Sequence, residues 1–328
     1  TVSSRGVYHL PIEKYELHES LKVTSYDIIA PPWGYPPDIE FEALKNNPTN
    51  LGQFIWTGFD YLGEPTPFGG RDNSTNGYWN DDWPARSSYF GAVDLCGLPK
   101  DRFYLYQSQW TAKPMVHVLP HWNWEGMEGM EIPVLSYTNC EEVELFVNGK
   151  SYGKRVKGVD KTPIPINFID WEGGRYEGDF MSPYRLHWDV PYEAGEIKVV
   201  GYIDGQAVAE KRVKTAGEPA RIELVADRGL IQSDGEDMAF VTVRIVDADG
   251  KLCPNADNLV AFELEGEGQL VAVGNGNPAT TESFQADKRK AFSGKFMAFI
   301  QASSTPGDIV LKAKSEGLSG TEVTIRTR

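Results

Sequence analysis

The stretch EEVELFVNGKSYGKR, residues 141–155, alternates apolar with polar side chains on both sides of an Asn-Gly pair. An alternation with a period of two is typical of a half-buried β-strand, and Asn-Gly between two such runs is a strong signal for a two-residue hairpin turn. The stretch therefore predicts an antiparallel hairpin. Its apolar face needs a second layer to cover it, which favours a sandwich.

The same pattern continues along the chain on both sides of this hairpin. From residue 131 to residue 217, alternating runs are broken by Asn-Gly, Ala-Gly and Asp-Gly turns, and about seven strands fit. After an expected linker at Gly217–Pro219, a second series begins with ARIELVADR. We expect two antiparallel, immunoglobulin-like sandwiches, at residues 116–217 and 218–328. Because neither contains a cysteine pair, the immunoglobulin-like label depends on strand count alone.

Residues 1–115 show a different pattern, with predicted helices as well as a strand. PPDIEFEALKNN (36–47) predicts a helix with Asp38 as its N-cap, GQFIWTGFDY (52–61) predicts a strand, and DRFYLYQSQW (101–110) predicts a second helix capped by Asp101. A helix, a strand, a long loop and a helix are typical of a βα repeat with an expanded loop. The fold class is therefore mixed, and residues 1–115 are expected to be the terminal α/β segment of a (β/α)8 barrel.

Such a segment lacks most of its barrel. A barrel closes by pairing its first and last strands, so a strand at residues 53–60 would have bare edges. We expect residues 1–115 to be partly disordered, packed on the first sandwich, or paired with another copy in a homo-oligomer.

Composition limits the partners. The formal net charge of −15 repels polyanions, so we expect neither nucleic acid nor an anionic membrane as a partner. No run approaches the ~18 apolar residues of a membrane-spanning helix. The first residues, TVSSRG, include no initiator Met and no basic region before an apolar one, so the sequence is expected to be part of a longer protein.

The end of the predicted strand 52–61 is the candidate site. Trp56, Asp60, Tyr61 and Glu64 would lie at the C-terminal mouth of a barrel. An indole face packs against the apolar face of a sugar ring, while carboxylates and phenols hydrogen-bond to its hydroxyls. In the alternative, Trp56 is a core residue and the two carboxylates cap a turn. Asp60 and Glu64 are poor candidates for a catalytic pair, because they would approach a sugar from one side.

Other motifs give weaker signals. RDNSTNGYWNDDW (71–83) resembles a calcium loop but has Trp83 where a glutamate should stand, so a polar loop is favoured and no metal is assigned. The five histidines include no HExxH motif, and the three cysteines include no CxxC, so we predict no cofactor. The aromatic cluster PHWNWEGMEGME (120–131) could stack sugars, although packing at a domain junction is the more common role.

Three stretches together carry a family resemblance: FIWTGFDYLGEPTP, SSYFGAVDLCGLPKDRFYLYQSQW and VHVLPHWNW. They resemble the closing part of the catalytic barrel of family 2 glycoside hydrolases, in the bacterial β-galactosidase-like branch. The later units resemble the C-terminal β-sandwich domains of that branch. WTGFDYxGEP is the most specific motif. Some members have an Asn just before the glycine at position 91, where this sequence has Phe90.

The resemblance implies the C-terminal portion of a retaining, exo-acting β-galactosidase-type enzyme acting on β-linked oligosaccharides or polysaccharides. It implies that Trp56 is the sugar platform, with Asp60, Tyr61 and Glu64 as supporting positions. It further implies that both catalytic glutamates precede Thr1, so the chain contains no catalytic residue, and that the protein is periplasmic or secreted. The alternatives are a non-catalytic carbohydrate-binding or adhesin-like module and a structural spacer.

Overall fold

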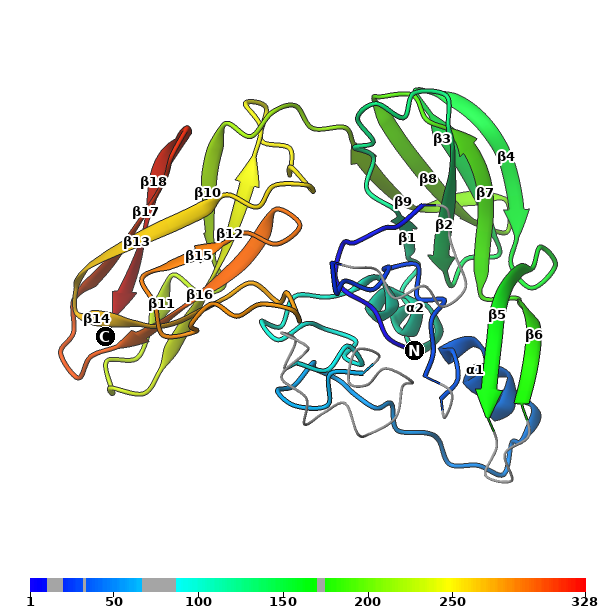
Figure 1. Ribbon diagram of the computed structural model, residues 1–328, viewed down its shortest axis with the longest axis horizontal. Helices are drawn as coiled ribbons and strands as arrows, with labels where there is room; N and C mark the ends of the chain where they lie inside the picture. Colours follow the sequence, from blue (N-terminus) through cyan, green and yellow to red (C-terminus); the bar gives the residue numbers. More distant parts are fainter. Residues whose placement is uncertain (11–19, 32–33, 67–86, 170–174) are drawn as a thin grey trace. The chain divides into compact units, whose positions relative to one another are not determined.

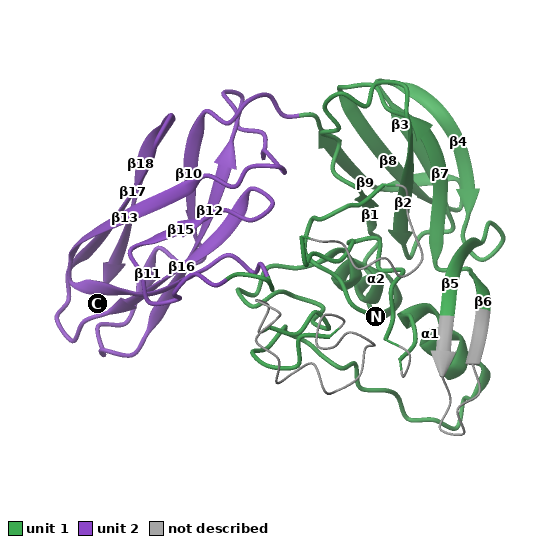
Figure 2. Ribbon diagram, in the orientation of Figure 1, with its two compact units in different colours: residues 1–215, 278–280 green, residues 216–277, 281–328 purple. Residues whose placement is uncertain are grey.

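The computed structural model describes residues 1–10, 20–31, 34–66, 87–169 and 175–328, without the side chains of residues 167–177. The described chain is mostly β, with two helices, and it divides into two compact units. One unit comprises residues 1–215 and 278–280, and the other comprises residues 216–277 and 281–328 (Figure 2). The expected linker at 217–219 begins two residues after the first of these boundaries.

The sandwich strands of the first unit form three sheets (Figure 1). One sheet has the order β1-β2-β7, a second has the order β4-β3-β8-β9, and β5 pairs with β6. The strands are β1 Val116–Leu119, β2 Glu131–Thr138, β3 Glu142–Val147, β4 Lys150–Val156, β5 Thr162–Ile169, β6 Arg175–Ser182, β7 Arg185–Pro191, β8 Glu196–Ile203 and β9 Gln206–Lys214.

The hairpin predicted from residues 141–155 is confirmed. β3 and β4 pair antiparallel, with Val147 opposite Lys150. Between them, Asn148 has φ of 49° and Gly149 has φ of 82°, the left-handed values that a two-residue hairpin turn requires. Alternate side chains of β3 are buried, and they join a core that includes the wholly buried Trp122.

The second unit contains nine strands, in the order β14-β16-β12-β10-β18-β17-β13-β15, with β11 pairing with β18. β10 and β18 meet through a single parallel pair, Arg221 with Ser319, and β11 also pairs parallel with β18, while the other pairs are antiparallel. One apolar core lies within the unit. The strands are β10 Arg221–Ala226, β11 Leu230–Ile231, β12 Met238–Val246, β13 Leu259–Gly266, β14 Gly268–Gly274, β15 Lys288–Lys290, β16 Lys295–Ala302, β17 Asp308–Ser315 and β18 Leu318–Thr327.

Both predicted helices form. Helix α1 spans Pro37–Asn46 and helix α2 spans Asp101–Trp110, and α2 packs on β1 and β2 (Figure 1). Both capping predictions are wrong, because the N-caps are Pro36 and Lys100 and neither makes a side-chain capping bond. Asp38 and Asp101 lie inside the first turns, where their carboxylates bind distant side chains instead.

The predicted strand at 52–61 does not form. Residues 51–58 have no regular structure, and Phe59 makes only an isolated parallel bridge with Val93. A strand needs neighbours on its edges, and the described residues supply only a short one, with backbone hydrogen bonds from Ala92 N to the Thr57 carbonyl, from Val93 N to the Gly58 carbonyl and from Asp60 N to the Val93 carbonyl. The described part of residues 1–115 nevertheless has a core, which contains Val2, Tyr26, Tyr89 and Leu105 and extends to Tyr137 of β2. The described part of this segment packs on the first sandwich, which is one of the three expected outcomes.

Among the described residues, no helix has the length and apolarity to cross a membrane.

Candidate functional site

An exposed apolar row runs along residues 51–62. Its members are large side chains that face solvent: Leu51, Phe54, Trp56, Phe59 and Leu62. Large apolar side chains that gather on a surface mark a contact with a ligand or with another part of a structure. Trp56 is 72% exposed, so the alternative that it belongs to a core does not hold in this chain.

Polar contacts orient the indole of Trp56. Its Nε1 donates a hydrogen bond to the hydroxyl of Tyr61 at 3.1 Å, and the two rings meet edge to face with centroids 6.2 Å apart. The Tyr61 hydroxyl donates in turn to the carboxylate of Glu64. Glu64 reaches this position through a left-handed backbone with φ of 47°. The peptide bond between Trp56 and Thr57 is cis. Three of the four predicted site residues therefore form one connected group, which we call the Trp56 wall (Trp56, Tyr61 and Glu64).

Asp60, the fourth predicted residue, points away from solvent. It is 4% exposed, accepts a hydrogen bond from the Gly91 backbone at 2.8 Å, and pairs with Lys100, whose Nζ lies 2.7 Å from Oδ2. Burial raises the pKa of Asp60, and the Lys100 ammonium opposes this rise. Its carboxylate is therefore occupied by protein groups.

Sequence reasoning missed Lys100. It lies immediately before α2, where a cation faces the positive end of the helix dipole, and this local mismatch is the signal that could have identified it. Burial lowers the pKa of Lys100, while Asp60 opposes that shift.

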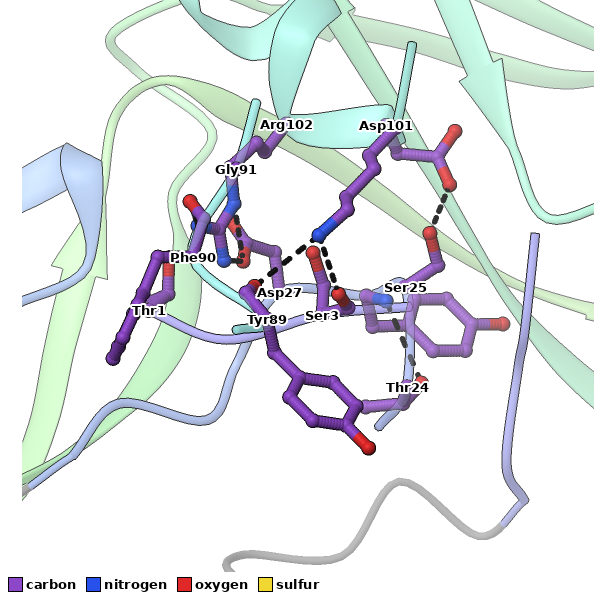
Figure 3. A network of polar contacts seen from close by, with 12 residues as sticks. Thr1, Ser3, Thr24, Ser25, Asp27, Tyr89, Phe90, Gly91, Asp101 and Arg102 are labelled. Atoms are coloured by element: carbon purple, nitrogen blue, oxygen red, sulfur yellow. Dashed lines mark hydrogen bonds and ion pairs between the residues drawn. The ribbon is translucent and has the colours of Figure 1, made fainter. Parts of the chain in front are cut away.

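Two residues that follow Lys100 anchor further segments (Figure 3). Asp101 accepts hydrogen bonds from the hydroxyls of Tyr8 and Ser25, each at 2.5 Å, and contacts His117 Nε2 at 2.7 Å. The guanidinium of Arg102 pairs with Asp27 and donates to the Phe90 carbonyl at 2.6 Å. Phe90 is buried, and its carbonyl accepts the hydrogen bond from Arg102.

The aromatic cluster at 120–131 packs within the protein. Trp122 is fully buried and donates to the Glu193 carbonyl at 2.9 Å, while Trp124 donates to the His121 carbonyl at 3.0 Å. Burial lowers the pKa of His121 to about 4. Sugar stacking by these two indoles is therefore excluded in this chain.

No metal centre emerges from the described ranges, where no group of three His, Cys, Asp or Glu could hold an ion. The calcium-like stretch 71–83 lies outside the described residues. All three cysteines are buried.

Comparison with known proteins extends over almost the whole chain. A curated β-galactosidase of Bacteroides ovatus is 42% identical over 326 residues, which cover 96% of this chain and 34% of that protein. The family model "Glycoside hydrolase family 2 C-terminal domain 5" matches residues 222–324. This chain belongs to glycoside hydrolase family 2. A domain of unknown function (DUF4982) matches residues 129–209.

Other family 2 relatives agree with this assignment. A putative β-glucuronidase of Formosa agariphila is 35% identical over 81% of this chain and 23% of its own length. The crystal structure of a β-glycosidase from Bacteroides vulgatus matches with a TM-score of 0.80 and 29% identity, over 99% of this chain and 40% of that chain. This family 2 chain thus spans about a third of the Bacteroides ovatus relative.

Proposed function

We propose that this chain forms part of a retaining, exo-acting β-galactosidase-type glycoside hydrolase that removes terminal sugars from β-linked oligosaccharides or polysaccharides. The observation that carries the proposal is the 42% identity to a β-galactosidase across 96% of the chain, which includes the Trp56 segment. We further propose export to the periplasm or the medium, as the family resemblance implies.

In this proposal, residues 1–115 are the closing segment of a (β/α)8 barrel. Helices α1 and α2, and the parallel contact of Phe59 with Val93, support that assignment. The exposed row at 51–62 supports it as well, because further barrel strands would cover some of these side chains. Residues 116–217 and 218–328 would be the two immunoglobulin-like domains.

Trp56 supplies the sugar platform in this enzyme. Its indole is exposed and held by Tyr61, whose hydroxyl is fixed by Glu64. A retaining mechanism needs two carboxyl groups about 5 to 5.5 Å apart on opposite sides of the scissile bond. Asp60 is paired with Lys100 and Glu64 is bonded to Tyr61, so neither fits that role. We assign the catalytic pair to the two thirds of the relatives' length that this chain does not span.

The test assays the full-length protein that carries these residues, beside the 328-residue chain, on aryl β-galactoside, β-glucuronide and β-mannoside. We expect the full-length protein to cleave the β-galactoside fastest, with the β-anomer as the first product by NMR. Turnover by the 328-residue chain would contradict the placement of the catalytic pair. If neither protein hydrolyses any substrate while the chain is retarded on polysaccharide gels, a carbohydrate-binding module replaces the enzyme.

A matched pair of variants tests the platform. Trp56→Ala should lower kcat/KM about 30-fold, as loss of a central aromatic contact worth ~2 kcal/mol would. Trp110→Ala removes a similarly exposed indole, 63% accessible, from α2 and should leave kcat/KM unchanged. Equal effects of the two substitutions would remove Trp56 from the site.

A further inference from the structure

Lys100 is a buried ammonium with three sets of partners. Its side chain is 1% exposed, and Nζ donates to the Ser3 carbonyl at 2.8 Å, to the Tyr89 carbonyl at 3.2 Å and to Asp60 Oδ1 at 2.9 Å. Ser3, Tyr89 and Asp60 belong to three separate segments of the chain. One side chain therefore ties together residues that are 97, 11 and 40 positions away from it.

Burying a lone ammonium is costly, and an ion pair offsets that cost only when the remaining protons are hydrogen-bonded. Both conditions are met here, because Asp60 neutralises the charge and two carbonyls accept the other protons. The position before α2 adds an unfavourable helix dipole. An apolar residue could fill this space without those costs. What the ammonium adds is a set of directional hydrogen bonds, which apolar packing does not provide.

The backbone segments that carry the partners of Lys100 are in close contact with one another. A Cβ added to Gly91 would lie 2.2 Å from the Asp60 nitrogen and 2.3 Å from the Val93 carbonyl oxygen. Asp60 N also donates to that carbonyl at 3.0 Å, and Ser3 N donates to the Tyr89 carbonyl at 3.0 Å. Figure 3 shows Ser3, Tyr89 and Gly91 gathered in the same network.

The Trp56 wall continues directly from this point. Tyr61 follows Asp60, and its backbone bonds twice to Ser88: Tyr61 N donates to the Ser88 hydroxyl at 3.1 Å, and Ser88 N donates to the Tyr61 carbonyl at 2.8 Å. The Tyr61 hydroxyl then holds Trp56 and Glu64. A continuous path of bonds therefore leads from the Lys100 ammonium to the indole.

We propose that Lys100 is a positioning residue of the glycoside pocket, which sets the Trp56 wall in register with the segments that contain Ser3 and Tyr89. The inference rests on the proposed function, since the wall must bind a sugar. Lys100 itself touches no substrate. Its loss should shift the platform, and shifts near 1 Å at a binding site can cost up to ~100-fold.

The first test needs no enzymatic activity. The 328-residue chain is labelled with 5-fluorotryptophan, and the Trp56 resonance is assigned as the one that disappears in Trp56→Phe. Lys100→Met should move or broaden that resonance. Because Lys100→Met leaves Asp60 buried and unpaired, Lys100→Met/Asp60→Asn is a second variant that removes both charges. The matched control, Arg185→Met/Asp38→Asn, removes another wholly buried ion pair of the same unit. It should leave the resonance in place.

The second test is a kinetic cycle in the full-length protein. Lys100→Met/Asp60→Asn should raise KM for the aryl β-galactoside about tenfold, at equal concentrations of folded protein. Combined with Trp56→Ala, it should raise KM no further, because a displaced platform matters only while the indole is present. A merely structural role would lower thermal stability and the folded fraction but leave KM unchanged.

The outcomes separate the two claims. An unmoved Trp56 resonance in both Lys100 variants overturns the positioning role, whatever the enzyme does. Additive effects of Trp56→Ala and the double variant on KM overturn it as well. If the resonance moves but the wild-type full-length protein cleaves no glycoside, the proposed function fails while the structural coupling stands.

Discussion

The ion pair between Arg185 and Asp38 gives a prediction that follows directly from burial. Both side chains are fully buried, and the pair joins β7 to α1. Arg185 Nε lies 2.9 Å from Asp38 Oδ1, Nη2 lies 2.5 Å from Oδ2, and Nη1 donates to the Tyr26 carbonyl at 2.8 Å. Burial alone would lower the pKa of Arg185, but the Asp38 carboxylate outweighs this effect and holds that pKa above its usual range, so the guanidinium stays charged.

Arg185→Met should destabilise the first unit by about 3–5 kcal/mol, because it leaves the Asp38 carboxylate buried without its partner. For a unit of this size, 1 kcal/mol corresponds to ~2–4 °C, so Tm should fall by roughly 10 °C. The assay is thermal unfolding followed by calorimetry. The second unit has its own core, so its transition serves as an internal reference. Arg185→Met/Asp38→Asn should regain at least half of the loss. A single variant within 1 kcal/mol of wild type would refute the reasoning.

Three further predictions concern the first unit. The pKa of His121 falls from 6.5 to about 4 on folding. The free energy of unfolding should therefore be highest above pH 6.5 and should fall by up to ~3 kcal/mol as the pH falls to 4, because the unfolded chain takes up the proton more readily. His121→Phe should flatten that part of the stability profile, and an unchanged slope would contradict it. Gly149→Ala should destabilise by about 1 kcal/mol in urea titration, since φ is 82° although the added methyl contacts nothing; an unchanged midpoint would count against this. Gly201→Ala should lower the free energy of unfolding by about 1–3 kcal/mol, because the added methyl would lie 2.7 Å from Cys140 Sγ and Val116 Cγ1. An unchanged midpoint in the same urea titration would contradict this prediction.

Local signals explain which elements the sequence could predict. Asn148 and Gly149 adopt the expected left-handed turn, and Asp204 and Gly205, with φ of 50° and 73°, do the same between β8 and β9. Hairpins and short helices depend on neighbouring residues, so their signals lie within ten to fifteen positions. The segment 52–61 has strand-forming residues, but a strand also needs an edge to pair with. Composition could not show that, in the described chain, this segment pairs only briefly, with residues 88–93.

The carboxylates show what local sequence patterns cannot predict. An aspartate near the start of a helix suggests a cap, and this was the interpretation of Asp38 and Asp101. The structure pairs Asp38 with a residue 147 positions away and gives Asp101 a hydrogen bond from a residue 93 positions before it. A local pattern cannot distinguish a capping carboxylate from one that a distant cation neutralises. For the same reason the sequence, which predicts Asp60 as a supporting position of the sugar pocket, could not show that it pairs with Lys100.

These long-range pairs explain how the described parts of residues 1–115 are held together with few strands among them. Sheet hydrogen bonds normally fix the relative positions of strand ends, but here the described segments meet mainly through isolated bridges. Lys100 and Arg102, two residues apart, instead bond to Ser3, Asp60, Tyr89, Phe90 and Asp27. Because charged hydrogen bonds are directional, two side chains at the start of one helix can fix several segments at once. In the proposed positioning role, the geometry of the Trp56 wall depends on one cation, Lys100, whose side chain is 1% exposed.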